Sequence, residues 1–191
     1  MEKVILMSIH SNPLINILNE DKLREIRKKF PKDYRGWIYL YCCKGGAPVF
    51  IPWEFEVEKQ EDGTYKALTD FERGNGKVVA RFWCDGVDNI NVVFEKYCAG
   101  DLSQEGLLDY SCLSFDELHD YLNGYSGARK IGKAIHITKL EIFDKPKPLS
   151  DFRKVGYETV QYQTMRTSEA DKWRLTRAPQ SWQYVFVESS I

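Results

Sequence analysis

Short runs of strand-like residues, each closed by a turn, constrain the fold of this chain more than any other feature. The clearest runs span 4–9, 36–43, 76–85, 134–143 and 182–187. They are rich in β-branched and aromatic side chains, which favour strands, and they are separated by only a few short helical patterns. Strands and long helices do not alternate regularly. The pattern therefore predicts an α+β fold whose strands form a small mixed β-barrel with a few short helices.

Two helices are predicted from local signals. Asn12 is placed as the N-cap of the first, with Pro13 at the first helical position, and the apolar spacing over 14–18 continues it. Residues 114–117 form the Ser-x-x-Glu pattern of a capping box, which opens the second helix. An apolar face follows each of these signals, so both helices should pack on the core.

Two segments interrupt the run of strands and are interpreted as insertions. Residues 44–76 show a hairpin pattern around the turn 61–63, and 98–124 carries six acids with no Lys or Arg. A helical turn is also expected at 104–109. A chain of 191 residues suits one domain. We therefore predict a single domain over 1–191, with a hairpin insertion at 44–76 and an acidic helical insertion at 98–124.

Composition narrows the function classes. The formal net charge of −1 argues against a globally basic nucleic-acid binder, so any such attraction must come from a local patch. The five cysteines contain no C-x-x-C pair, and the three histidines show no metal-ligand spacing. We expect free thiols in a reduced, cytoplasmic protein without a metal or cofactor. The apolar run 4–9 is too short for a signal or a membrane span, so no membrane contact is expected.

The stretch 19–37 packs seven cations against four acids and is the strongest candidate for a site. If 24–28 is extended, Glu25 and Arg27 lie side by side on one face, because side chains two apart share a face. Such a fork of acceptors and donors suits the polar edge of a planar ligand. Lys22 has the opposite strand parity, so it joins them only if the chain turns there. The alternative interpretation is a structural ion pair at a strand end.

The spacing Lys22-x-x-Glu25-x-Arg27 resembles the G-x-K-x-x-E-x-R signature of the ASCH domain family, which has a PUA-like barrel. The runs 6–10, 76–80 and 176–182 look similar to the same family. Glu20 stands where the family usually has Gly. The resemblance implies a PUA-like mixed β-barrel with a cleft that binds RNA or a modified nucleobase, and its implied contacts are His10, Lys22, Glu25, Arg27, Arg177, Gln180, Ser181 and Trp182.

The resemblance leaves the chemistry open. In the first hypothesis a single-stranded or flipped base stacks on an aromatic ring, for which Trp182 is a candidate, while Glu25 and Arg27 read its edge. In the alternative the protein is a small hydrolase of a modified nucleoside such as an N4-acylated cytidine. Glu25 would then be the general base and Lys22 would hold the developing negative charge, although hydrolytic relatives carry Thr at the position of Glu25. A third possibility is an interaction module that uses the acidic segment 98–124.

Overall fold

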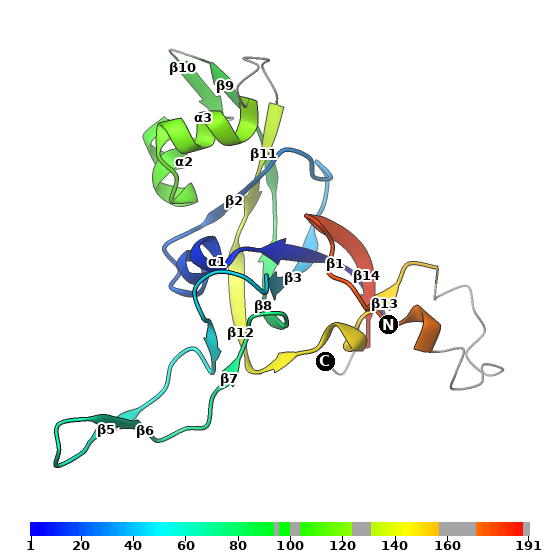
Figure 1. Ribbon diagram of the computed structural model, residues 1–191. Coiled ribbons are helices and arrows are strands. Elements are labelled where there is room, and N and C mark those ends of the chain that lie inside the picture. The colour runs from blue at the N-terminus through cyan, green and yellow to red at the C-terminus, as the bar shows by residue number, and fades with distance from the viewer. Residues whose placement is uncertain (94–95, 100–103, 124–130, 157–170, 189–191) are drawn as a thin grey trace. The chain divides into compact units, whose positions relative to one another are not determined.

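The computed structural model describes residues 1–93, 96–99, 104–123, 131–156 and 171–188 (Figure 1). The chain divides into two compact units, which are described separately. Unit 1 comprises Met1–Leu14, Ile38–Arg81 and Glu141–Ile191, and unit 2 comprises Ile15–Trp37 and Phe82–Leu140. In the described part of the chain, no helix is long and apolar enough to cross a membrane.

The larger sheet, most of whose residues belong to unit 1, has six strands in the order β12-β8-β3-β1-β14-β13. β1 lies inside the sheet, parallel to β3 on one side and antiparallel to β14 on the other. All residues of β1 from Val4 to Ile9 are buried, because a central strand is covered on both faces. The strands are β1 (Glu2–Ile9), β3 (Gly36–Cys42), β8 (Val78–Cys84), β12 (Thr138–Lys147), β13 (Arg153–Lys154) and β14 (Trp182–Val187).

Short helical elements lie wholly or partly in unit 1. The helix α1 (Ser11–Leu18) starts at Ser11, so Asn12 and Pro13 lie within its first turn and Asn12 is not the N-cap. Its predicted apolar positions, Leu14, Ile17 and Leu18, are buried as expected. Two single turns, η2 (Leu149–Asp151) and η5 (Asp171–Trp173), lie in the C-terminal part of unit 1.

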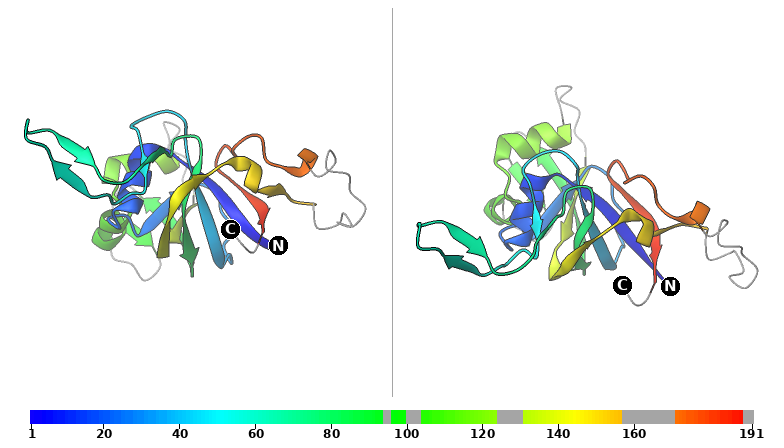
Figure 2. Two further views of the ribbon diagram at one scale, coloured as in Figure 1. Left: turned by 90° about the horizontal axis from the view of Figure 1, so that it is seen from below. Right: turned by 60° about the horizontal axis from the view of Figure 1, so that its bottom comes forward.

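The predicted hairpin at 44–76 forms two short ribbons of unit 1. Strand β4 (Phe50–Ile51) pairs with β7 (Glu72–Arg73), and β5 (Val57–Lys59) pairs with β6 (Tyr65–Ala67). Gly63 turns the chain between β5 and β6 at a φ of 84°, a conformation that favours glycine. We call residues 50–73 the arm of unit 1. Both views in Figure 2 show the β5–β6 ribbon at the end of the arm that is far from the six-stranded sheet.

Unit 2 is built on a four-stranded sheet in the order β10-β9-β11-β2, with β2 at one edge. Ile26 and Ala134 oppose each other on the face that packs against Leu118 and Leu122 of α3. The carboxylate of Glu117 accepts from the Ser114 N–H at 2.8 Å, which confirms the predicted capping box. The elements are β2 (Arg24–Arg27), β9 (Val87–Val93), β10 (Lys96–Ala99), β11 (Ile131–His136), α2 (Gln104–Ser111) and α3 (Phe115–Asn123).

The α+β class is confirmed, since strands predominate and the helices are few and short. The finer prediction of a PUA-like closed barrel is not shown: among the described residues, neither larger sheet has a strand order that returns to its first member. The predicted strand 134–143 is two strands, β11 and β12, separated at Ile137. Residue 124 and part of the acidic insertion, 100–103, lie outside the described residues.

Candidate functional site

The structure brings Lys22, Glu25 and Arg27 together in unit 2. Glu25 and Arg27 share one face of β2, and the Arg27 Nε lies 3.0 Å from Glu25 Oε1. The Lys22 Nζ lies 3.2 Å from the other carboxylate oxygen, Oε2. Lys22 and Glu25 are only 4% and 5% exposed. Each oxygen of the Glu25 carboxylate thus faces a cation in a nearly buried cluster.

A tight turn after α1 places Lys22 in this cluster. The Glu20 N–H donates to the Ile17 carbonyl at 3.0 Å, and the Lys22 N–H donates to the Asn16 carbonyl at 2.9 Å. Glu20 has a φ of 62°, in the left-handed region that glycine adopts at the lowest cost. The turn therefore forms with Glu20 at the position where the resemblance implies Gly. Because Lys22 lies in this turn and not in an extended strand, the alternation of strand faces does not separate it from Glu25.

A small cavity of about 180 Å³ lies beside Lys22 in unit 2. Its lining includes Glu20 and Lys139, and both have positive φ values, 62° and 45°. Residues held in such conformations often mark ligand sites, because the surrounding structure must hold them there. At roughly 30 Å³ per water, the cavity has room for a small planar group. Its other lining residues are Ile17, Leu23, Ile137, Thr138 and Leu140.

Four other cations of the basic stretch face solvent. Lys28, Lys29, Lys32 and Arg35 are exposed. The Lys28 Nζ lies 5.2 Å from the ring centroid of Tyr121, within the range of a cation–π contact. Burial raises the pKa of Tyr121, so its hydroxyl keeps its proton at neutral pH. These side chains are accessible to solvent and to an external ligand.

A larger pocket of about 480 Å³ lies in unit 1 and contains a predicted residue, Arg177. Two more cations, Lys44 and Lys77, share the pocket, and Tyr41 lies at its wall with 5% exposure. The Lys77 Nζ also pairs with the Glu72 carboxylate at 2.8 Å. Burial, together with the neighbouring Cys43 and Cys42, raises the pKa of Tyr41. The pocket also includes Gly76, Pro148, Leu149, Thr176 and Ala178.

The other predicted residues of unit 1 lie around the start of β14. The Ser8 N–H donates to the Ser181 carbonyl at 2.9 Å, and the Ser8 hydroxyl donates to the Pro179 carbonyl at 2.7 Å. Trp182 is the first residue of β14, and its ring lies edge-on to Tyr184 at 5.9 Å. Gln180 is exposed. The turn is therefore fixed to β1 through its backbone, which leaves the Gln180 side chain in solvent.

His10 belongs to unit 1 and is exposed, and its carbonyl accepts from the Leu14 N–H at 3.1 Å. The eight predicted contacts thus divide between the units. Lys22, Glu25 and Arg27 belong to unit 2, and the other five belong to unit 1. Within unit 1 the pocket includes Arg177 but not His10 or Trp182.

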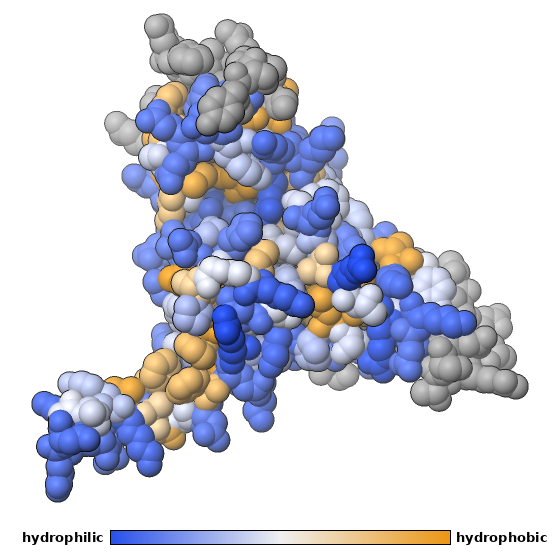
Figure 3. All heavy atoms as spheres, viewed as in Figure 1, coloured by the Kyte–Doolittle hydropathy of each residue, from blue (hydrophilic) through white to orange (hydrophobic). Residues whose placement is uncertain are grey.

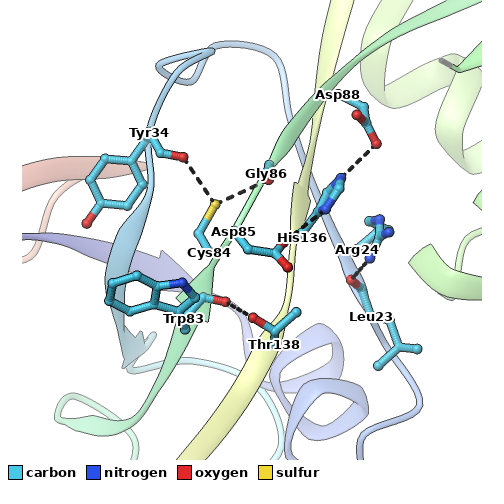
Figure 4. A network of polar contacts seen from close by, with 10 residues as sticks. All are labelled: Leu23, Arg24, Tyr34, Trp83, Cys84, Asp85, Gly86, Asp88, His136 and Thr138. Atoms are coloured by element: carbon cyan, nitrogen blue, oxygen red, sulfur yellow. Dashed lines mark hydrogen bonds and ion pairs between the residues drawn. The ribbon is translucent and has the colours of Figure 1, made fainter. Parts of the chain in front are cut away.

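Sequence reasoning missed a polar network in unit 2, which Figure 4 shows from close by. His136 bridges two carboxylates: Nδ1 lies 3.1 Å from Asp85 Oδ1, and Nε2 lies 2.8 Å from Asp88 Oδ2. The His136 N–H donates to the Gly86 carbonyl at 3.0 Å. A side chain on Gly86 would come within 2.8 Å of the imidazole, so glycine leaves room for the ring. The network therefore fixes the histidine at the junction of β8, β9 and β11.

Comparisons with known proteins give little further definition. No family model matches the chain, and no curated protein matches it. The chain is similar in structure to a crystal structure of a mutant form of the ZmASCH protein from Zymomonas mobilis. The aligned region covers 96% of this chain and 90% of that chain. The sequence identity is 13% and the TM-score is 0.45. This likeness is too low to place the chain in a family, so the ASCH resemblance stays a prediction.

Proposed function

We propose that the protein is a PUA-like module that binds single-stranded RNA or a nucleobase, and that the cationic pocket of unit 1 contacts a phosphate group of this ligand. The observation that carries this proposal is the convergence of Lys44, Lys77 and Arg177 on one pocket of about 480 Å³. Its volume is within the roughly 300–1,000 Å³ of typical ligand sites. Arg and Lys are the side chains that bind phosphate oxygens, and Arg does so with a bidentate fork.

The neutral groups of the pocket complement the cations. The raised pKa of Tyr41 keeps its phenol protonated, so the hydroxyl is available as a donor to a phosphate or base oxygen. Thr176 adds a hydroxyl beside Arg177. One phosphate group would therefore meet positive charge and hydrogen-bond donors in the same pocket. Edge recognition by Glu25 and Arg27 in unit 2 stays a separate prediction.

The salt dependence of RNA binding tests this proposal. Each cation in contact with a phosphate of a single strand contributes about −0.7 to the slope of log binding constant against log salt concentration. Three such contacts therefore predict a slope of about −2. The double variant K44A/R177A should reduce the slope to about −0.7 and weaken binding of a fluorescein-labelled oligouridine at low salt. The measurement is fluorescence anisotropy across a salt series.

A matched control uses two exposed lysines of unit 1 that lie outside the pocket, Lys59 and Lys66. K59A/K66A changes the net charge by the same amount, so it should keep the slope near −2 if contact is local. Equal slopes in both double variants would show that the attraction is non-specific. An unchanged slope in K44A/R177A alone would remove the pocket from the proposal.

A further inference from the structure

The arm of unit 1, residues 50–73, exposes an unusual amount of apolar surface. Figure 3 shows hydrophobic residues along the arm and a hydrophilic tip at its end. Large aromatic side chains bury roughly 150–250 Å² when covered, so six half-exposed apolar side chains leave on the order of 500 Å² uncovered. The largest apolar patch on a typical monomer has about this size and is often functional, so this surface is a candidate interaction site. The six, between 38% and 67% exposed, are Phe50, Phe55, Val57, Tyr65, Leu68 and Phe71.

The same arm is acidic. It carries seven acids and three bases, a net charge of −4, whereas the whole chain has a net charge of −1. Along 54–58 the sequence alternates Glu-Phe-Glu-Val-Glu, and all five residues are exposed. Within β5, Val57 and Glu58 therefore point to opposite faces, because successive side chains of a strand alternate. A complementary strand would alternate basic and apolar residues in the same period.

The backbone of β5 offers an edge for such a strand. The Leu68 N–H donates to the Glu56 carbonyl at 2.9 Å, and the Gln60 N–H donates to the Thr64 carbonyl at 2.8 Å. Because the direction of backbone groups alternates along an antiparallel strand, the N–H and C=O groups of Val57 and Lys59 point to the outer edge. Among the described residues, the sheet that contains β5 has only β6 as its second member. A ribbon of two strands is marginal in water, and a third strand completes it.

We propose that β5 accepts a third strand from a basic partner protein, in an extended segment that alternates Lys or Arg with apolar residues. Main-chain hydrogen bonds to Val57 and Lys59 would hold the segment, while Glu56 and Glu58 would select its cations. Pairing of two arms would oppose two net charges of −4, which disfavours a second copy as the occupant. The same charge repels nucleic-acid phosphates, so this surface differs in chemistry from the cationic pocket.

The experiment measures binding of a fluorescein-labelled peptide of alternating Lys and Val to the full chain by anisotropy. V57P keeps an apolar side chain but removes one outward N–H donor, and proline is tolerated at a strand edge. It should weaken binding by about tenfold. This is the effect expected when one main-chain hydrogen bond is lost and the proline ring also blocks close approach of the added strand. E56K/E58K should weaken the Lys–Val peptide by at least about tenfold and should favour a Glu–Val peptide instead.

The control E61K/D70K changes the net charge equally at two exposed positions outside β5. It should retain binding within about threefold, because neither position lies in β5 opposite the bound segment. The proposal is overturned if the intact protein does not bind the Lys–Val peptide, or if both charge variants lose it equally. Binding of oligouridine that V57P abolishes would identify RNA as the occupant. A dimer in sedimentation velocity that V57P dissociates would identify a second copy.

Discussion

Replacement of Glu25 by alanine gives the clearest test of whether the charged cluster of unit 2 stabilises the fold. The substitution leaves Lys22, whose side chain is 4% exposed, without the carboxylate 3.2 Å away. It also removes the partner 3.0 Å from the Arg27 Nε, in a side chain 12% exposed. Breaking a buried pair by removal of one partner costs about 3 to 5 kcal/mol, since the remaining charge stays desolvated. For a chain of this size, that cost lowers Tm by about 6 to 20 °C.

Urea unfolding and differential scanning calorimetry measure the two quantities. A matched control is Glu141→Ala, because the Arg81–Glu141 pair of unit 1 has a similar distance, 2.7 Å, but a Glu141 side chain that is 45% exposed. Exposed pairs contribute about 0 to 1 kcal/mol, so this variant should unfold close to the unchanged protein. The comparison separates the effect of burial from the effect of ion pairing as such.

Two further variants sharpen the result. Arg27→Ala should cost less than Glu25→Ala, about 1 to 3 kcal/mol, because Glu25 retains Lys22. The triple replacement K22M/E25L/R27M should recover much of the loss from Glu25→Ala, since apolar residues of similar size often replace a buried ion pair without cost. If Glu25→Ala lowers the free energy of unfolding by less than about 1 kcal/mol, solvent screens these charges, and the inference that burial makes the pairs important for stability is wrong. Loss of RNA affinity in such a stable variant would then favour the role of Glu25 as a contact.

Two other predictions concern local strain and pH. Glu20→Gly should raise the free energy of unfolding, measured in urea titrations, by about 0.5 to 1 kcal/mol. The reason is that the backbone strain of Glu20 at a φ of 62° costs more than the conformational entropy that glycine adds to the unfolded chain. A loss of stability would contradict this prediction. Burial raises the pKa of the Cys84 thiol to about 11, so the folded state retains this proton at pH values where the unfolded thiol loses it. The stabilisation from Cys84 should be complete below about pH 8.5 and should fall as the pH rises toward 11. Cys84→Ser should remove only part of the total slope, because burial also raises the pKa of the Cys42 thiol to about 11, and a slope that Cys84→Ser leaves unchanged would contradict the prediction.

Local signals predicted the elements that local chemistry determines. The capping box at 114–117 was correct because its hydrogen bonds join residues three apart, and Glu117 makes them with Ser114. The strand at 36–43 was correct because both of its faces are apolar, and Tyr39 is fully buried as core. Its ring packs against Phe152 at 5.4 Å, and its hydroxyl accepts from Arg81 at 2.9 Å. The start of α1 was misplaced because the first helical hydrogen bond runs from the Leu14 N–H to the carbonyl of His10, which is not among the preferred N-cap residue types.

The pocket of unit 1 could not be predicted from the spacing of residues in the sequence. Arg177 was selected through a resemblance, whereas Lys44 and Lys77 were not selected at all. These cations come from three segments that are far apart in the sequence, and they meet only through the pairing of strands in the sheet. A single sequence contains no periodic signal for such a meeting. Tyr41 lies in the predicted strand 36–43, and with 5% exposure it is both buried and part of the pocket wall.

The burial of Lys22 was not predicted from the composition of the basic stretch 19–37. Lys and Arg are rarely buried, and this rule favoured a surface or site role for the basic stretch, but the rule exempts paired cations. Lys22 meets that exemption because the turn at Glu20 brings it to a carboxylate that Arg27 also contacts. Pairing by itself is compatible with a structural cluster and with a ligand contact. The two roles can be separated because Glu25→Ala perturbs unit 2, whereas K44A/R177A perturbs the pocket of unit 1. A stability loss confined to the first variant and an affinity loss confined to the second would assign structure to the cluster and binding to the pocket.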